Sequence, residues 1–123
     1  MTGKRILLVD DEEELLKAMK VRLAALGYDV FTAVNGEEAI RFVKMNVPDA
    51  VILDIMMPKL DGIETLRQIR CFNKNIPVFM LTAYGDYENV GNTMDLGIAG
   101  FIHKGIEFEN ASELIRIALK GQK

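Results

Sequence analysis

Short runs of branched apolar residues recur along this chain and alternate with helical patterns five times. The clearest runs are Arg5–Val9 and Ala50–Leu53. Continuous apolar runs of this length predict strands that are buried on both faces, as in a parallel sheet. Parallel strands need crossover connections, and the helical segments between the runs can supply them. The pattern therefore predicts an α/β fold, with right-handed crossovers and helices on both faces of the sheet.

The expected elements follow one another with short connections and without a linker or an internal repeat. Strands are expected at about 5–9, 29–33, 50–53, 77–81 and 100–103. Helices are expected at about 13–25, after Asn35, and at about 62–72, 86–96 and 112–120. The helix at 86–96 is the weakest, because Asn89, Gly91 and Asn92 fall within one turn. It is either a short helix held by packing or a segment poised to move.

The composition bounds the class of protein. The 123 residues suit one domain, 1–123, and half of them are apolar, which excludes a disordered chain. A net charge of −3 and scattered Lys and Arg argue against direct nucleic-acid binding. The apolar runs are too short to span a membrane, and the N-terminus lacks the apolar region of a signal peptide. A lone Cys71 fits a reducing compartment, so we expect a cytoplasmic protein.

Carboxylates follow two of the apolar runs at the point where each run ends. Asp10 and Asp11 come directly after the first run, and Asp54 comes after the run at 50–53. In open α/β sheets, ligands bind at the carboxyl ends of the strands, so these side chains are expected to converge there. Nearby carboxylates repel one another, and Mg²⁺ prefers such oxygen ligands. The alternative is that all three are solvated turn residues, since Asp is common in turns.

The two later strands add a hydroxyl and an amine to the same edge. Thr82 directly follows the run at 77–81, and the small Ala83 after it lets a group approach closely. Lys104 directly follows the last expected strand, where it would also balance the carboxylates. His103 is expected to point to the opposite side. Such a set suits the handling of a phosphoryl group, with a metal ion neutralising charge and a carboxylate attacking in line.

Four motifs occur in a fixed order. They are Val9-Asp10-Asp11, then Asp54-Ile55-Met56-Met57-Pro58 with Asp61-Gly62, then Leu81-Thr82-Ala83, and lastly Gly100-Phe101-Ile102-His103-Lys104. With these motifs the chain resembles, from end to end, a response-regulator receiver domain of bacterial two-component signalling. The resemblance implies a flavodoxin-like, doubly wound α/β fold, whose five parallel strands lie in the order 2-1-3-4-5.

The resemblance also implies a phosphorylation site. Asp54 would accept a phosphoryl group from a histidine kinase or a histidine phosphotransfer protein. Asp11, Asp54 and the backbone carbonyl of Met56 would bind Mg²⁺, and Asp10 would act on the ion through water. We expect the helix after Asp11 to turn Glu12 away from this site. Apart from its own phosphorylation and dephosphorylation, such a domain is not an enzyme.

Other residues would sense and modulate that reaction. By the same resemblance, Thr82 and Lys104 would contact the phosphoryl oxygens, and Phe101 would be the switch aromatic that moves with Thr82. The switch would alter the surface formed by 86–96, 100–103 and 112–120. Met56, Ala83 and Tyr84 occupy positions that modulate the site, and a bulky Tyr84 could shield an aspartyl phosphate from water.

One position departs from the family pattern. The family lysine is usually followed by a proline across a cis bond, whereas Lys104 is followed by Gly105. A cis bond before a residue other than proline costs about 2.5–4 kcal/mol, so a trans bond is expected here. The loop from Gly105 to Phe108 should then run differently from that of the family.

Two other functions stay open. A metal-dependent phosphatase with an aspartyl nucleophile generally carries Asp-x-Asp after the first strand, whereas this chain has Asp10-Asp11 and no inserted cap. A degenerate receiver would bind partners without phosphorylation, and the presence of Asp54, Thr82 and Lys104 counts against it. The downstream effector is unknown. No effector domain follows Lys123, so the protein either signals by docking alone or is part of a larger regulator.

Overall fold

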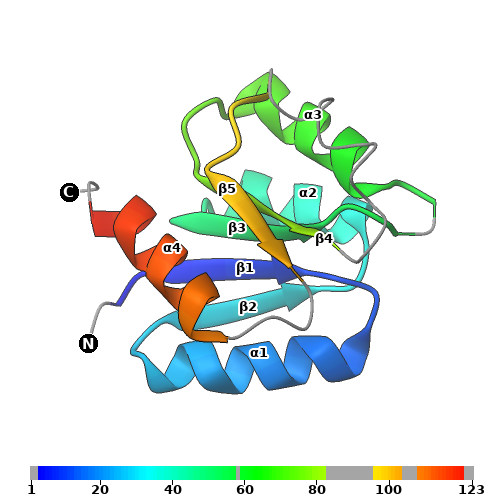
Figure 1. Cartoon of the computed structure of the whole chain (residues 1–123). Helices are drawn as coiled ribbons and strands as arrows, with labels where there is room; N and C mark the ends of the chain where they lie inside the picture. The colour runs from blue at the N-terminus through cyan, green and yellow to red at the C-terminus, as the bar shows by residue number, and fades with distance from the viewer. Residues whose placement is uncertain (1–2, 58, 83–95, 104–107, 121–123) are drawn as a thin grey trace.

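The structure, a computed structural model, describes residues 3–57, 59–82, 96–103 and 108–120. Five strands form one parallel sheet in the order β2-β1-β3-β4-β5 (Figure 1). The strands are β1 (Arg5–Val9), β2 (Asp29–Ala33), β3 (Ala50–Asp54), β4 (Val78–Thr82) and β5 (Gly100–His103). The described helices are α1 (Glu13–Ala25), α2 (Gly36–Met45), α3 (Gly62–Phe72) and α4 (Phe108–Lys120). The predicted doubly wound sheet and its strand order are confirmed.

Helices cover both faces of the sheet, and each face has its own apolar core. α1 and α4 lie on one face, where Leu23 and Ile115 belong to the same apolar core as Ile52 of the central strand (Figure 1). α2 and α3 lie on the other face, where Val43 and Leu66 belong to a second core. The alternating residues of β1 and β3 point into one core or the other, which is why both strands are continuously apolar.

The register of the sheet brings the ends of the central strands together. Val9 of β1 pairs with Leu53 of β3, so Asp10 and Asp54 follow neighbouring positions. Asp54 itself pairs with Leu81 of β4, and Thr82 is the last residue of that strand. The carboxyl ends of β1, β3 and β4 therefore meet at one edge, as the strand-end argument predicts.

The entry to α3 lies directly against the end of β3. The Asp61 side chain caps α3 by accepting a hydrogen bond from the Glu64 backbone N–H at 2.9 Å. The Gly62 backbone N–H donates to the carbonyl of Ile55 at 2.8 Å. A Cβ at position 62 would lie 2.0 Å from the carbonyl oxygen of Asp54. The Asp61-Gly62 pair thus both starts the helix and permits this close approach.

The element bounds differ slightly from the prediction. β3 and β4 each end one residue later than expected, at Asp54 and Thr82. The C-terminal helix begins at Phe108 instead of about residue 112, because 108–111 holds no Gly or Pro that would stop it. The helix expected at 86–96 lies, except for Leu96, outside the described residues. Among the described helices, none is long and apolar enough to cross a membrane.

Candidate functional site

Asp54 lies at the end of the central strand β3 and is almost completely buried. Its side chain is 1% exposed, and one carboxylate oxygen, Oδ1, accepts a hydrogen bond from the Met56 backbone N–H at 3.2 Å. At the next residue, the Ile55 backbone N–H donates a hydrogen bond to the Leu81 carbonyl of β4 at 3.1 Å. These bonds fix the direction in which the carboxylate points out of the strand end.

Asp10 lies at the end of the neighbouring strand β1 and is fully buried, with an exposure of 0%. Its backbone N–H donates to the Ala33 carbonyl at 3.1 Å, which continues the ladder with β2 by one residue. Its Oδ1 atom accepts a hydrogen bond from the Glu12 backbone N–H at 2.9 Å. Asp10 therefore also organises the turn that leads into α1.

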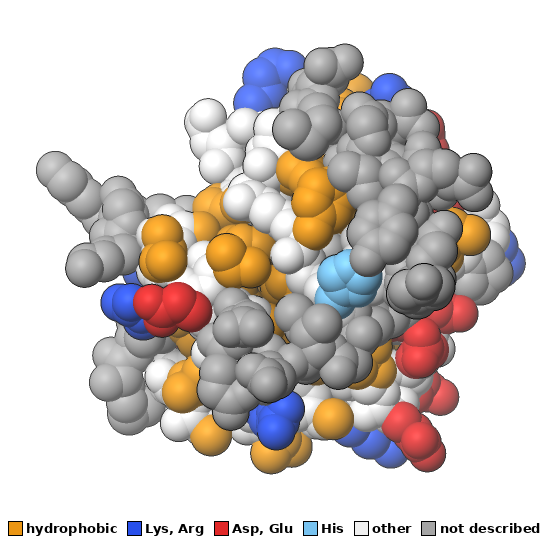
Figure 2. All heavy atoms as spheres, in the orientation of Figure 1, with side chains coloured by type: hydrophobic (Ala, Val, Ile, Leu, Met, Phe, Trp, Pro, Cys, Tyr) orange, Lys and Arg blue, Asp and Glu red, His pale blue; other side chains and the backbone are white. Residues whose placement is uncertain are grey.

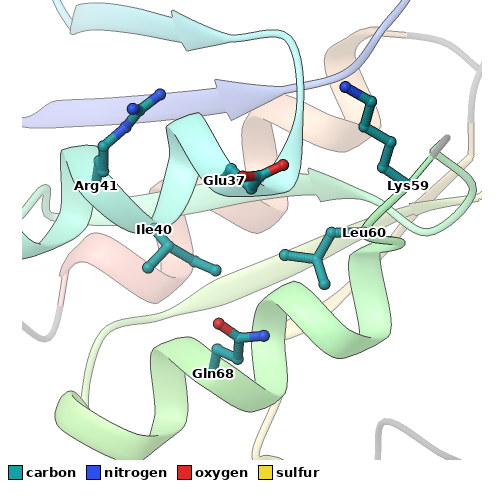
Figure 3. Close-up of a pocket in the computed structure, with 6 residues that line it drawn as sticks. All are labelled: Glu37, Ile40, Arg41, Lys59, Leu60 and Gln68. Atoms are coloured by element: carbon teal, nitrogen blue, oxygen red, sulfur yellow. The ribbon is translucent and has the colours of Figure 1, made fainter.

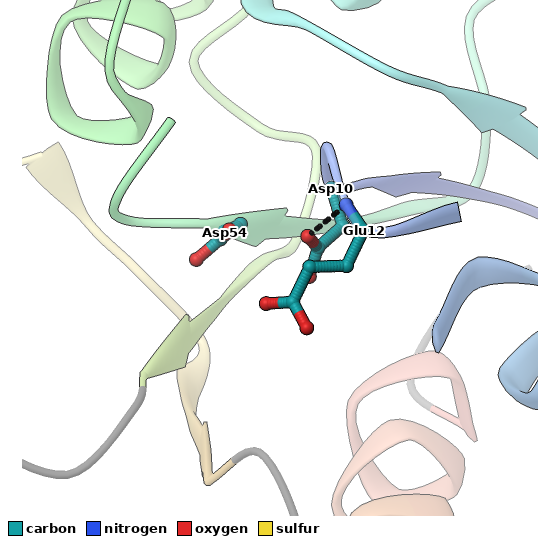
Figure 4. A group of neighbouring side chains, drawn as sticks. All are labelled: Asp10, Glu12 and Asp54. Carbon is teal, nitrogen blue, oxygen red and sulfur yellow. Dashed lines mark hydrogen bonds between the residues drawn. The ribbon is translucent and has the colours of Figure 1, made fainter. Parts of the chain in front are cut away.

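Asp10, Glu12 and Asp54 form a carboxylate cluster at this edge of the sheet (Figure 4). One carboxylate oxygen from each residue lies within 4.8 Å of the others. The convergence of Asp10 and Asp54 agrees with the sequence prediction. The outward orientation expected for Glu12 is wrong, because this exposed residue turns its carboxylate toward the other two. Asp11 is exposed and is not one of the three described members of the cluster.

Thr82 adds a buried hydroxyl at the end of β4. The residue is 2% exposed, and its Oγ1 has no hydrogen-bond partner among the residues that the structure describes. A buried hydroxyl without a partner is uncommon in folded proteins, and a missing ligand is one physical explanation for it. The position of Thr82 beside the end of β3 suits a hydroxyl that receives a ligand oxygen there.

Met56 and Phe101 differ in their exposure. The Met56 side chain is 55% exposed, at the start of the loop that follows Asp54. Phe101 is partly buried on β5 and packs against the core beneath α2 and α3. An aromatic side chain that is only partly buried has room to move into or out of the core. The role of Phe101 as the switch aromatic stays a prediction.

Several predicted residues lie outside the part of the chain that the structure describes. They are Lys104, which was expected to contact the phosphoryl group, the Ala83 and Tyr84 pair after β4, and Gly105 with its expected trans bond. Their roles stay predictions.

The donor set of the carboxylate cluster fits Mg²⁺. The ion prefers carboxylate and carbonyl oxygens together with retained water, and it is usually held by one or two carboxylates. Asp10 and Asp54 supply buried carboxylates, while Glu12 stands on the exposed side, where water can enter. Figure 2 shows acidic side chains gathered at the lower right of the molecule. In Figure 1, which has the same orientation, the strands β1 and β2 point toward that side.

A hollow of about 560 Å³ lies between α2 and α3, away from the carboxylate cluster (Figure 3). Ile40, Leu60 and Gln68 line it, together with the charged residues Glu37, Arg41 and Lys59. Lys59 and Leu60 belong to the loop between Asp54 and α3, so the hollow adjoins the same loop. The hollow contains neither a buried carboxylate nor a buried hydroxyl among its described lining, and it does not suit phosphoryl transfer.

Comparison with known proteins identifies the family. The family model of the response regulator receiver domain matches residues 6–116. The chain is 36% identical, over 118 residues, to the alkaline phosphatase synthesis transcriptional regulatory protein PhoP of Bacillus subtilis (strain 168). That match covers 96% of this chain and 49% of the relative. The chain spans about half the length of the curated relatives it matches.

Solved structures show the same relationship. A response regulator receiver domain protein from Clostridium thermocellum is 33% identical, with a TM-score of 0.88 over 95% of this chain and 94% of that chain. The receiver domain of the Francisella response regulator 1452 has a TM-score of 0.88 at 29% identity, over 98% and 99% of the two chains. This chain belongs to the response-regulator receiver domain family of two-component signalling systems.

Proposed function

We propose that this receiver domain is a phosphoacceptor whose phosphorylated residue is Asp54. The observation that carries the proposal is the buried Asp54 carboxylate at the end of β3, with the oxygens of Asp10 and Glu12 within 4.8 Å. The buried Thr82 hydroxyl supports it, because it lacks a partner among the described residues. A phosphoryl group on Asp54 would give that hydroxyl an acceptor.

The reaction is a transfer from the phosphohistidine of a histidine kinase or a histidine phosphotransfer protein. An Asp54 carboxylate oxygen attacks the phosphorus in line with the P–N bond. The new P–O bond forms as the P–N bond breaks, and the imidazole nitrogen that leaves takes up a proton from water. The Met56 N–H, which donates to Oδ1 at 3.2 Å, orients the carboxylate for this attack.

A magnesium ion is the cofactor that this site suits. The residues that would hold it are Asp54, Asp11 and the backbone carbonyl of Met56, with Asp10 acting through water. When bound, the ion supplies positive charge that offsets the negative charge of the carboxylates and the phosphoryl group. Asp11 enters this set by family resemblance, and its exposed position leaves it able to approach from the solvent side.

The remaining residues act on the phosphoryl oxygens and on the lifetime of the product. Thr82 donates its hydroxyl to one oxygen, and Lys104 pairs with another. Tyr84 shields the aspartyl phosphate from attacking water, and Met56 and Ala83 shape the approach to it. The domain catalyses only its own phosphorylation and dephosphorylation.

The output is a change at the surface formed by β5, α4 and the segment 86–96. The described part of that surface already exposes apolar side chains, since Leu114 is 39% and Ile117 is 59% exposed on α4. Exposed apolar side chains of this kind suit contact with another protein or domain. Phe101 on β5 would transmit the state of Thr82 to this surface, and the partner would be a downstream effector, not a nucleic acid.

The test is labelling by acetyl phosphate in the presence of Mg²⁺, followed on phosphate-affinity gels. The parent protein should be labelled, and removal of Mg²⁺ with a chelator should abolish labelling. Asp54→Asn should not be labelled, because the amide is not a nucleophile. Turnover of a generic phosphomonoester would instead indicate a phosphatase, and the absence of any labelling would indicate a degenerate receiver.

Asp61→Asn is the matched control for this experiment. It makes the same chemical change seven positions along the chain, and Asn caps a helix about as well as Asp. The cap bond to the Glu64 N–H at 2.9 Å can therefore be kept. Labelling of Asp61→Asn should equal that of the parent. Loss of labelling in both variants would point to a general effect of these substitutions and would contradict the assignment of Asp54.

A further inference from the structure

We propose that the hollow between α2 and α3 is a binding site for a small organic anion with an apolar body. It is lined by Glu37, Ile40 and Arg41 of α2, by Lys59 and Leu60 of the loop before α3, and by Gln68 of α3 (Figure 3). None of these residues belongs to the carboxylate cluster or to the residues proposed to act on the phosphoryl group. The site therefore lies outside the phosphorylation machinery and does not depend on it.

The walls of the hollow are held together by a close approach of α2 and α3. A Cβ at Gly36, the first residue of α2, would lie 2.1 Å from Oγ1 of Thr65 and 3.0 Å from Cδ2 of Leu60. That Oγ1 atom also donates a hydrogen bond to the Asp61 carbonyl at 2.8 Å, which fixes its position. The hollow has a volume of about 560 Å³, and small-molecule sites are usually preformed clefts of about 300–1,000 Å³. Its size and its fixed walls therefore suit a small ligand.

Two apolar side chains line the buried side of the hollow. Ile40 is 9% exposed and belongs to the core beneath α2 and α3, and Leu60 is partly buried against that core. Figure 3 shows the two side chains pointing toward one another, one from α2 and one from the loop. Contact with them would remove the apolar body of a ligand from water, which is a principal source of affinity in such sites.

Two cations flank these apolar side chains. Figure 3 shows Arg41 on α2 and Lys59 on the loop, toward opposite sides of the hollow. Within the part of the chain that the structure describes, neither forms a hydrogen bond or an ion pair. Glu37 lies four residues before Arg41 on α2, a spacing that favours an ion pair, yet these two side chains do not pair. Both cations are therefore available to the anionic group of a ligand.

The charge of the lining is opposite in sign to that of the whole chain. Arg41 and Lys59 bring two positive charges and Glu37 brings one negative charge, so the lining carries +1, whereas the chain carries −3 at pH 7. A locally positive surface on an acidic protein attracts anions to that place. The charge thus selects an anion, and the apolar side chains select one with an apolar body.

The backbone of Lys59 provides separate support for a ligand site. Its φ is +67°, in the left-handed region that an L-residue adopts only at a cost in energy. The surrounding structure must fix such a conformation, and residues held in this way are found preferentially at active sites and ligand clamps. The strained residue of this loop is also the one that brings an ammonium group to the hollow.

The test uses two fluorescent probes that share an aromatic body. Anilinonaphthalene sulfonate carries one anionic group, and phenylnaphthylamine has the same aromatic rings without it. Binding of each probe to the whole domain is followed by the rise in its fluorescence, with neither a phosphodonor nor a metal ion present. The anionic probe reports the apolar contacts and the cations together, whereas the uncharged probe reports the apolar contacts alone.

Charge variants should act on the anionic probe in opposite directions. Arg41→Gln should raise its dissociation constant by about 2- to 5-fold, because an exposed ion pair contributes modestly. The double variant Arg41→Gln/Lys59→Gln should raise it by about 5- to 20-fold. Glu37→Gln should lower it by about 2- to 5-fold, since it removes the anion that competes with the probe. Binding of the uncharged probe should change by less than about 2-fold in all three variants.

Arg67→Gln is the matched control. Arg67 is also an exposed arginine, precedes Gln68 on α3, and is not part of the described lining. Its substitution should change the dissociation constant of the anionic probe by less than about 1.5-fold. Opposite effects of Arg41→Gln and Glu37→Gln could not both arise from damage to the fold, so the comparison stays informative even if one variant is less stable.

NMR of the backbone amides locates the bound probe. The amide signals of residues 36–41 and 59–68 should shift together, with the dissociation constant that fluorescence gives. Shifts centred on the exposed Leu114 and Ile117 of α4 would overturn the proposal, because they would place the probe on another surface. Equal weakening by Arg41→Gln and Arg67→Gln, or the absence of saturable binding to the parent protein, would overturn it as well.

Discussion

The missing side chain of Gly62 shapes the end of β3. A Cβ at this position would lie 2.0 Å from the Asp54 carbonyl oxygen and 2.8 Å from Ile55 Cα, and both are backbone atoms that cannot rotate away. Gly62→Ala should therefore push the start of α3 away from the strand. Overpacking of this kind typically costs about 1–3 kcal/mol, and a backbone clash belongs at the upper end. Urea unfolding should show this loss, and labelling of Asp54 should slow because its strand end moves.

Gly100→Ala is the control for this prediction. A Cβ at Gly100 would lie 3.6 Å from the Phe79 ring, which is an ordinary contact. Its unfolding free energy should stay within about 0.5 kcal/mol of the parent value. If Gly62→Ala is as stable as Gly100→Ala and is labelled at the parent rate, the close approach of α3 is not needed for the site.

Lys59 carries backbone strain in the loop between β3 and α3. Its φ is +67°, and it is the one residue other than glycine with a positive φ in the described part of the chain. This conformation costs an L-residue roughly 1–2 kcal/mol, whereas glycine adopts it freely. Lys59→Gly should therefore raise the unfolding free energy by about 0.5–1 kcal/mol, after the greater freedom of the unfolded glycine is subtracted. Thermal unfolding measures the change.

Lys59→Ala separates strain from charge in that experiment. Alanine removes the ammonium group but keeps the Cβ that makes a positive φ costly. Its stability should stay close to that of the parent protein. A gain of equal size in both variants would show that the charge of Lys59, and not its backbone conformation, is unfavourable.

Single residues differed in how far the sequence could predict them. The meeting of Asp10 and Asp54 was predictable, because it follows from strand ends and parallel topology alone. The position of Glu12 was not, because helical spacing describes residues inside a helix and Glu12 is an N-cap with extended angles. The strain at Lys59 likewise has no signal in the sequence, since lysine is not among the residues that favour a positive φ.

At the scale of elements, Arg70 ties α3 to the chain that leads into β5. It is 8% exposed, and its Nε donates to the Leu96 carbonyl at 2.7 Å. Nη2 donates to the Gly97 carbonyl and Nη1 to the Asn73 carbonyl, each at 3.2 Å. Burial lowers the pKa of this guanidinium from its ordinary value. Three carbonyl acceptors therefore compensate the burial of this cation. Two of these hydrogen bonds also hold the segment that precedes β5 against α3.

Arg70→Met should loosen that connection while keeping most of the apolar stem of the side chain. Hydrogen bonds to a charged donor contribute about 1.5–3 kcal/mol each in favourable cases, and the substitution leaves the three partly buried carbonyl groups without this donor. We expect a loss of about 2–3 kcal/mol in urea unfolding. Hydrogen exchange should quicken at Ala99, whose N–H donates to Val78 at 2.8 Å.

Arg67→Met tests whether any arginine of α3 would behave in this way. Arg67 is about half exposed and pairs with Glu64 at 3.4 Å on the helix surface. Surface pairs of this kind contribute at most about 1 kcal/mol. Arg67→Met should therefore leave both stability and exchange at Ala99 almost unchanged. Equal losses in the two variants would contradict a specific role for Arg70.

Elements were easier to predict than single residues. β1, β2, β5, α1 and α3 have the expected bounds, because continuous apolar runs and clear helical stripes identify them. The N-caps at Asn35 and Asp61 also lie where the sequence indicates helix starts. The start of α4 was placed too late, since no Gly or Pro marks it. The Arg70 contacts join residues far apart in the sequence, and local patterns do not report such contacts.

At the scale of the whole molecule, the carboxylate cluster exists only when the fold exists. Its members come from the end of β1, the N-cap of α1 and the end of β3, which are brought together by the pairing of β1 with β3. In the unfolded chain Asp10 and Asp54 are far apart in sequence, and neither their repulsion nor a shared metal site is present. The stability of the entire domain is therefore linked to the occupation of this one site.

Mg²⁺ should accordingly stabilise the folded domain. At an ion concentration ten times the dissociation constant, the gain in unfolding free energy is about 1.4 kcal/mol, because only the folded state binds. Asp54→Asn should lose this gain. In the absence of Mg²⁺ it should also be more stable than the parent, since a neutral amide removes one of three charges that repel one another. Urea unfolding with MgCl₂, against NaCl of equal ionic strength, measures both effects. An equal gain from Mg²⁺ in Asp54→Asn and in the parent would show that the ion binds elsewhere.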